Sequence, residues 1–229
     1  MPCIIVSSPT VHRRKTDKAG SAGRPKSTPP AHEPAFSFAI PMKLWLVRHA
    51  QPLVEPGVCY GRLDLPADAG ATAACARQLA ERLPAGIRIA SSPLQRCEQL
   101  AQALLGLRPD LTYETDARLQ EMDFGQWEGR AWESIGPAAL AAWTDDFAGY
   151  RVGGSGESVA GFMARVGAAF DALAGPGPAL WVTHAGVIRA AGLLARGVRQ
   201  VAQAQQWPLQ APKYGQWQLL DLTAGQAAQ

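Results

Sequence analysis

The sequence predicts a three-layer α/β/α fold, with helices on both faces of a mostly parallel sheet. Short, continuously apolar runs typical of buried strands alternate with longer segments whose apolar residues recur at helical spacing. Strands that alternate with helices favour parallel sheets, because each crossover helix returns the chain to the same end of the sheet. A length of 229 residues suits one sizeable domain.

Five segments are expected to form strands. The first reads Leu-Trp-Leu-Val and ends at Arg48-His49, and a later one of the same kind ends at His184. The expected strands cover 44–47, 87–90, 111–115, 179–183 and 214–222.

Helices are expected where apolar or small residues repeat with a period near 3.6. Ser92-Pro93-Leu94-Gln95 predicts an N-cap, a proline at the first helical position and a capping-box partner. The expected helices cover 69–83, 94–104 and 159–173, and a fourth begins near Gly186.

Two stretches between these elements are distinctive. One, which holds Trp127, Trp132 and Trp143, is interpreted as a helical excursion that covers another part of the molecule. The other, Gly153-Gly154-Ser155-Gly156, is interpreted as a flexible joint.

Residues 1–41 are rich in Pro, Ser, Ala, Lys and Arg, show no period, and are expected to be a disordered leader. A transit peptide fits this composition, and so does a true start at Met42. The segment holds six Lys or Arg and two acidic residues, so residues 42–229 carry a net charge of −1 although the whole chain carries +3. The expected domain, 42–229, is therefore not a general basic surface for nucleic acid.

Membrane and disulfide classes are also disfavoured. No run of about eighteen apolar residues occurs, so no membrane partner is expected. The four cysteines show no Cys-x-x-Cys spacing, and Cys75 and Cys97 lie on the apolar stripes of expected helices. Buried free thiols in a reducing cytoplasm are the expected arrangement.

Four residues point to chemistry at one edge of the sheet, because ligands of such sheets bind beyond the carboxyl ends of the strands. His49 and His184 are the only histidines in 42–229, and both stand at strand ends. Arg48 precedes the first, and Arg96 lies in the first turn after the second strand. Two imidazoles beside two guanidinium groups form a pocket for a dianion such as phosphate. For Arg96 alone, a solvated surface charge is the alternative.

An acid for the leaving oxygen would come from Glu121, Asp123 or Glu128, and residue type does not choose among them. No metal-ligand spacing occurs, so no metal or other cofactor is expected. The chain lacks a P-loop and a Gly-x-Gly-x-x-Gly fingerprint, and 154–156 does not complete a serine-hydrolase elbow.

Five ordered motifs resemble those of the histidine phosphatase (phosphoglycerate mutase-like) superfamily, from about residue 42 to 222. They are Leu46-Val47-Arg48-His49-Ala50, Ser91–Cys97, Leu119–Gly129, Gly156-Glu157-Ser158 and Thr183–Arg189. The resemblance implies a phosphoglycerate mutase-like fold with His49 as phosphoryl acceptor and Glu121 as acid and base. It also implies that Arg48, Arg96 and His184 bind the transferring group.

Departures within the motifs favour a phosphatase over a mutase. Ala50-Gln51-Pro52-Leu53 and His184-Ala185-Gly186 lack the Ser, Asn and His-Gly-Asn of phosphoglycerate mutases. The stretch 58–66 closely resembles the branch that includes α-ribazole phosphatase of cobalamin biosynthesis. There Arg62 would contact substrate, although a turn-stabilising role is an alternative.

The expected function is therefore a metal-independent, cytoplasmic phosphoric monoester hydrolase whose partner is a small phosphorylated substrate. A broad-specificity phosphatase and a mutase-like enzyme are the alternatives. A non-catalytic phosphoryl-ligand module is disfavoured, because every expected catalytic residue is present. The sequence leaves the oligomeric state open.

Overall fold

The computed structural model describes residues 42–173 and 177–222, all of which belong to one compact unit. Its sheet has five strands in the order β3-β2-β4-β1-β5. β5 runs antiparallel to β1, and the other neighbouring strands are parallel, which confirms the mostly parallel sheet. The strands are β1 Met42–Arg48, β2 Arg88–Ser91, β3 Tyr113–Thr115, β4 Ala179–Thr183 and β5 Trp217–Leu222.

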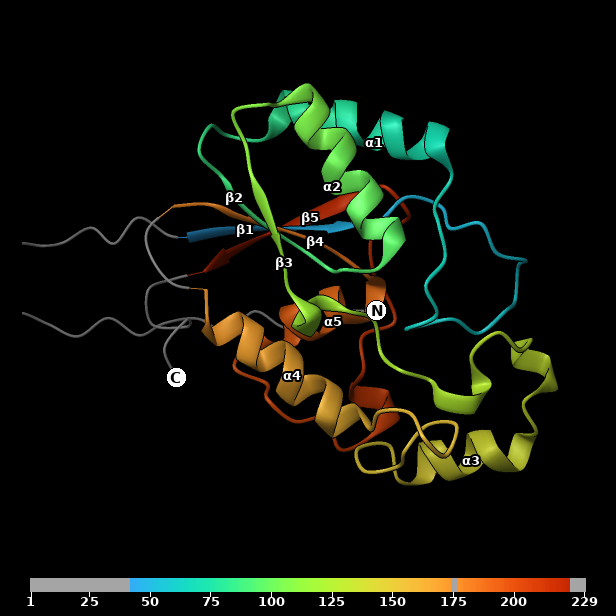
Figure 1. Ribbon diagram of the computed structural model, residues 1–229. Helices are drawn as coiled ribbons and strands as arrows, with labels where there is room; N and C mark the ends of the chain where they lie inside the picture. Colours follow the sequence, from blue (N-terminus) through green and yellow to red (C-terminus); the bar gives the residue numbers. More distant parts are fainter. Residues whose placement is uncertain (1–41, 174–176, 223–229) are drawn as a thin grey trace, which may run out of the picture. The chain divides into compact units, whose positions relative to one another are not determined.

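Helices cover both faces of this sheet, so the three-layer prediction is confirmed (Figure 1). α1 and α2 lie on one face, and α4 and α5 lie on the other. The helices are α1 Ala69–Arg82, α2 Gln95–Leu107, α3 Pro137–Asp145, α4 Val159–Asp171 and α5 Ala185–Leu194. Short 3₁₀ turns are η1 Ala117–Leu119, η2 Gly125–Trp127, η3 Trp132–Ser134 and η4 Ala204–Gln206.

The central strand β4 is buried at every position because both of its faces are covered. Its alternate side chains point to opposite faces. Leu180 and Val182 join the core beneath α1 and α2, whereas Trp181 joins the core beneath α4 and α5. Two apolar cores therefore fix the strand ends from both sides.

The start of α2 differs from the sequence prediction. The helix begins at Gln95, and its first turn is capped by Asp64, whose carboxylate accepts from Gln95 N at 2.7 Å and from Gln95 Nε2 at 3.1 Å. Ser92 is not the N-cap, which is Leu94. The Ser92 hydroxyl contacts the ring of His184 at 2.8 Å and accepts from Leu94 N only at 3.4 Å, so the predicted capping box was wrong.

The tryptophan-rich stretch is a helical excursion, as predicted. It contains η2, η3 and α3, and its three tryptophans form an aromatic cluster. Trp127 lies 6.4 Å from Trp132 and 5.9 Å from Trp143, measured between ring centroids. Phe124 packs edge-on against Trp132 at 5.4 Å, so the excursion braces the segment before η2.

The glycine-rich stretch 153–156 is a closely packed turn, and its interpretation as a flexible joint was wrong. Gly153 has φ +59°, and a Cβ there would collide with Phe124 O. Gly156 N donates to Val152 O at 2.9 Å, and a Cβ at Gly156 would collide with Asp123 O. Glycine is needed here for close approach to 123–126.

The remaining predictions concern the cysteines, membrane-spanning helices and the N-terminal segment. Cys59, Cys75 and Cys97 are buried free thiols, and burial raises the pKa of Cys75 and Cys97 to about 12. None of the helices in the described part of the chain combines the length and apolar character that a membrane span requires. The predicted leader, 1–41, lies outside the described residues.

Candidate active site

Two buried histidines meet where β1 and β4 end. Arg48 and Thr183 are register partners in these parallel strands, so His49 and His184 follow at the same edge. His49 N donates to Thr183 O at 3.0 Å, and the two ring centroids are 5.1 Å apart. The sheet register therefore brings together residues that are 135 positions apart, which the sequence predicted from their strand-end positions.

The ring of His49 is held in one tautomer. Its Nδ1 lies 2.7 Å from Ala50 O, and a carbonyl oxygen only accepts, so Nδ1 carries the proton. Nε2 then keeps its lone pair. A neutral imidazole with a fixed ring and a basic Nε2 is suited to nucleophilic attack.

Both imidazoles are held neutral. Burial lowers the pKa of His49 well below 6.5, and the nearby Arg96 and Arg48 guanidinium groups lower it further. The pKa of His184 is lowered well below 6.5 by burial first, and then by Arg96 and His49. A cation next to an imidazole disfavours its protonation, so the site concentrates positive charge on the arginines.

Arg96 is a buried residue with 0% exposure, so it is not a solvated surface charge. Its terminal nitrogens donate to Leu63 O at 2.8 Å and to Gly61 O at 2.6 Å. Arg48 donates to Pro212 O at 3.2 Å. Arg48 Nε and Arg96 Nε are two of the four buried side-chain nitrogens or oxygens without a hydrogen-bond partner among the described residues. An unmet buried donor costs about 1–3 kcal/mol, so an anion that accepts from both would be stabilised.

The ring of His184 is positioned by Cys97 on α2 and by Ser92, which lies just before that helix. Its Nε2 lies 2.8 Å from Ser92 Oγ and 3.5 Å from Cys97 Sγ. Thr183, directly before it, donates from its hydroxyl to Leu119 O at 2.8 Å. That bond ties the end of β4 to the segment that carries the three predicted carboxylates.

The structure separates these three carboxylates. The side chain of Glu121 packs against the start of α5, where one carboxylate oxygen accepts from Gly186 N at 2.9 Å. The other oxygen accepts from Met122 N, the next residue along the chain, at 3.1 Å. Gly186 is two residues after His184, so Glu121 is the carboxylate that reaches the histidine side of the site. Asp123 instead accepts from Gly125 N at 2.8 Å.

Glu128 has a different task. Its two oxygens accept from four backbone N–H groups, of Gly61, Arg62, Leu63 and Phe124, at 2.7–3.0 Å. These four bonds hold the backbone of two loop segments together. Glu128 therefore shapes the same 61–63 segment that holds Arg96.

Arg62 lies at the exposed rim, with 47% of its side chain accessible. Its guanidinium contacts Gln120 Oε1 at 3.3 Å and Asp123 Oδ2 at 3.6 Å. These contacts favour a loop-stabilising role, and contact with substrate stays a prediction.

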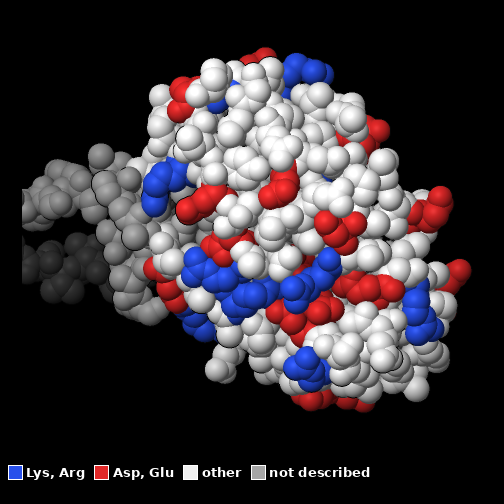
Figure 2. Space-filling model, in the orientation of Figure 1, with Lys and Arg blue, Asp and Glu red and all other residues white. Residues whose placement is uncertain are grey.

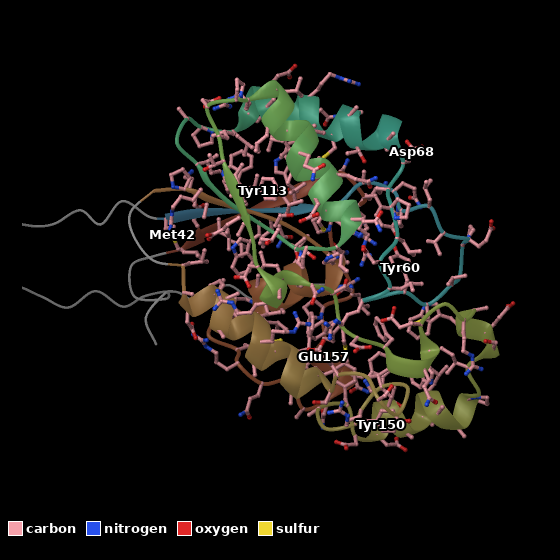
Figure 3. All side chains as sticks on the ribbon, viewed as in Figure 1. Met42, Tyr60, Asp68, Tyr113, Tyr150 and Glu157 are labelled. Carbon is pink, nitrogen blue, oxygen red and sulfur yellow. The ribbon has the colours of Figure 1, made fainter. Side chains whose placement is uncertain are left out.

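Sequence reasoning missed two tyrosines beside the arginines. Tyr60, on the loop between β1 and α1 (Figure 3), shares a 2.5 Å hydroxyl contact with Tyr214. Arg48 Cζ lies 3.8 Å above the Tyr214 ring, and Arg96 Cζ lies 5.5 Å from the Tyr60 ring centre. The Tyr214 ring also lies 5.6 Å from that of His49. Tyr60 falls inside the 58–66 stretch, whereas nothing in the sequence singles out Tyr214.

A second missed pair is Arg165 and Glu157, joined at 2.7 Å behind the segment that carries Glu121. Glu157 belongs to the Gly-Glu-Ser motif, but its partner gives no signal in the sequence. Within the described residues, no group of three His, Cys, Asp or Glu side chains is arranged to hold a metal ion.

The fold and the site define an α/β protein with a buried centre of two histidines and two arginines at the carboxyl ends of its parallel strands. The chain matches the family described as the histidine phosphatase superfamily (branch 1) over residues 44–228, and it belongs to that family. Members of this superfamily are generally phosphatases or mutases.

Solved structures agree with this assignment. TTHB049 from Thermus thermophilus is 31% identical, with 79% of this chain and 94% of that chain covered and a TM-score of 0.59. A phosphoglycerate mutase from the same organism is 33% identical, with 71% and 88% covered and a TM-score of 0.55. A mycobacterial glucosyl-3-phosphoglycerate phosphatase is 27% identical, with 67% and 79% covered and a TM-score of 0.55. The comparison with curated protein sequences found no match.

Proposed function

We propose that this protein is a phosphomonoesterase that passes the phosphoryl group through His49. One observation carries the proposal: His49 is buried and neutral, with Nδ1 fixed by Ala50 O and with the charges of Arg48 and Arg96 nearby. Each arginine has a buried Nε donor without a protein partner among the described residues. This arrangement supports both the nucleophile and the dianion that it attacks.

The reaction proceeds in two balanced steps. In the first, the Nε2 lone pair of His49 attacks phosphorus, the ester P–O bond breaks, and the departing oxygen takes a proton from Glu121. In the second, Glu121 takes a proton from water as the water oxygen attacks phosphorus. The P–N bond then breaks, and inorganic phosphate leaves with His49 restored.

Arg48, Arg96 and His184 stabilise the charge on the phosphoryl oxygens during both transfers. Phosphoryl transfer depends mainly on positioning and on electrostatic stabilisation of these oxygens, which two guanidinium groups supply without a metal ion. We therefore propose metal-independent catalysis. Hydrolysis of p-nitrophenyl phosphate should survive EDTA and be blocked by vanadate, and loss of activity on chelation would overturn this part of the proposal.

Water is the proposed acceptor, rather than a retained phosphoglycerate. The segment 50–53 and the Ala185-Gly186 pair lack the polar residues of the mutase motifs. Because a phosphoglycerate mutase is among the similar structures, mutase activity is the alternative. Conversion of 3-phosphoglycerate to 2-phosphoglycerate without phosphate release would favour it.

Within the phosphatases, we propose α-ribazole 5′-phosphate, an intermediate of cobalamin nucleotide-loop assembly, as the substrate. The 58–66 stretch supports this, because Tyr60 lies in it and pairs with Tyr214 beside the arginines. Two aromatic rings at the edge of a phosphoryl site offer a surface for the flat ring of a leaving alcohol. A broad-specificity small-molecule phosphatase is the alternative, since fold alone does not determine substrate.

The same proposal makes the partner a small cytoplasmic molecule rather than nucleic acid. On the face seen in Figure 2, Lys and Arg side chains gather in a band, and Asp and Glu side chains lie beside them. Paired charges of this kind do not form the continuous basic surface that a phosphate backbone requires.

The central test is rapid quenching after mixing with ³²P-labelled substrate. Phosphohistidine is lost in acid and survives alkali, so label should remain on the protein after alkaline quench and be absent from His49→Ala. Wild-type turnover without any alkali-stable label would refute the proposal. A screen of kcat/KM across α-ribazole 5′-phosphate, 3-phosphoglycerate and simple alkyl phosphates then tests the substrate; similar values for all would favour broad specificity.

A further inference from the structure

Arg165, on α4, binds the backbone of the segment that carries Glu121. Its Nη1 donates to Arg118 O at 2.9 Å and to Gln120 O at 3.0 Å, and its Nη2 lies 3.4 Å from Glu121 O. One guanidinium therefore holds carbonyl groups at and immediately before the proposed acid.

Glu157, labelled in Figure 3 just before α4, fixes this guanidinium and holds the segment on the other side. Its carboxylate accepts from Arg165 Nε at 2.8 Å and from Arg165 Nη2 at 2.7 Å. It also accepts from Asp123 N at 3.1 Å, and Glu157 N donates to Asp123 O at 2.9 Å. The ion pair therefore binds the backbone on both sides of Glu121: Arg165 holds the residues before it, and Glu157 holds Asp123 after it.

The carboxylate of Glu121 lies close against the first turn of α5. The Glu121 carboxylate accepts from Gly186 N in the first turn of α5, and a Cβ on Gly186 would collide with it. The backbone of 118–123 must therefore hold Glu121 close against α5, next to His184. A displacement of about 1 Å in such a group is enough to lower a rate about 100-fold.

We propose that Arg165 and Glu157 are a positioning pair for the proton transfer by Glu121. This inference rests on the proposed function, in which Glu121 protonates the leaving oxygen. Arginine suits the task because its planar group donates in several fixed directions at once, whereas lysine presents a single flexible charge. Among the described residues the pair makes no hydrogen bond to His49, and its hydrogen bonds converge on the segment that carries Glu121. Besides burial, the Arg165 charge also helps to lower the pKa of His184, so the leaving-group comparison below is needed to isolate the effect through Glu121.

Arg199 and Asp171 provide a matched control. They form an equally tight bidentate pair, at 2.7 Å for both hydrogen bonds, between the last residue of α4 and the segment after α5. Both pairs are part-exposed, with side-chain accessibilities of 21% for each partner in the first pair and 36% and 43% in the second. Breaking the control pair removes a bidentate guanidinium–carboxylate pair at the other end of the same helix.

The experiment compares kcat/KM for a poor and a good leaving group, because kcat/KM reports only the steps up to alcohol release. The variants are Arg165→Lys, Arg165→Gln, Glu157→Gln, Glu121→Gln and Arg199→Gln. For glycerol phosphate, whose alkoxide needs a proton, kcat/KM should fall about 10- to 100-fold in both Arg165 variants. For p-nitrophenyl phosphate, which leaves without one, it should stay within about threefold. Arg199→Gln should leave the ratio of the two unchanged.

Three results would overturn the inference: equal losses on both substrates, full rescue by Arg165→Lys, or unchanged rates in the Arg165 variants while Glu121→Gln shows the leaving-group effect. If Arg165→Gln does not fold, Glu157→Gln provides the same comparison. It weakens the ion pair with Arg165 but keeps one side-chain oxygen that can accept a hydrogen bond. The alkali-stable label on His49 reports the proposed function separately. Label without a leaving-group effect in Glu121→Gln would refute the acid role and with it this inference, but not the phosphohistidine.

Discussion

Gly186→Ala should separate catalysis from stability, because one methyl group would enter the space of the Glu121 carboxylate. A Cβ there would lie 3.0 Å from Glu121 Cδ and 3.3 Å from Oε2, and it would collide with Oε1. Ordinary contacts need about 3.5 Å, so the carboxylate must move by about 1 Å. We expect kcat/KM on an alkyl phosphate to fall about 100-fold, equivalent to about 2.7 kcal/mol of barrier.

Gly192 in the same helix provides the control, because a Cβ there meets nothing within 4 Å. Gly192→Ala should keep full activity and raise stability by about 0.5–1 kcal/mol through helix propensity. For a domain of this size that is about 1–4 °C in Tm. Steady-state kinetics and thermal unfolding measure both effects. Wild-type activity in Gly186→Ala would refute the assigned position of Glu121 in catalysis.

Three further predictions follow from burial and hydrogen bonding in the site. Arg96→Met should keep its fold by circular dichroism and lose about 100- to 1000-fold in kcat, since one stabilising donor is worth about 3–4 kcal/mol; a loss under tenfold would contradict its phosphate role. Because burial, then Arg96, lowers the pKa of His49 and His184 below the unfolded value of 6.5, the unfolded chain takes up protons first as pH falls. Stability is therefore full above pH 6.5 and declines below it, by at most about 1.4 kcal/mol per pH unit for each histidine; in urea titrations from pH 8 to 5, a stability that stayed flat or rose as pH fell would show that the folded imidazoles take up protons at least as readily as the unfolded chain. Tyr60→Phe and Tyr214→Phe remove the same hydroxyl contact, so each should shift the preference between ring-bearing and alkyl phosphates and the double variant should do no more; additive shifts in kcat/KM would show that the hydroxyls act separately.

The strand-end histidines were predictable for two reasons. The end of a buried strand can be recognised from the local sequence, and the alternation of strands with helices predicts that the strands are parallel. His49 and His184 each follow a continuous apolar run, and parallel strands end at one edge of a sheet. Arg96 was harder, because its spacing on α2 does not reveal that the 61–63 segment covers it. A charged residue is usually exposed, and only tertiary packing reverses that expectation.

Other parts of the site depend on contacts that no sequence pattern encodes. Ser92 reads as a helix cap, but the end of β4 places an imidazole against its hydroxyl. Glu121 and Glu128 are the same residue type, seven positions apart. Only the fold places the carboxylate of Glu121 against α5 and that of Glu128 against four backbone N–H groups of the loops. Tyr214 stands in the turn before β5, although the sequence predicted that the strand would begin at 214. A strand assignment gives no sign that this tyrosine lies beside Arg48.

The hydrogen bonds that hold Arg96 have a consequence for how such a protein can change its substrate preference in evolution. Its guanidinium is anchored by carbonyl groups of Gly61 and Leu63, within the 58–66 stretch on which the proposed substrate depends. A mutation that changes the backbone of this stretch would therefore also move the guanidinium group that is proposed to bind the phosphate. New substrates would be acquired most readily through side chains such as Arg62, which project from the rim without altering its backbone path.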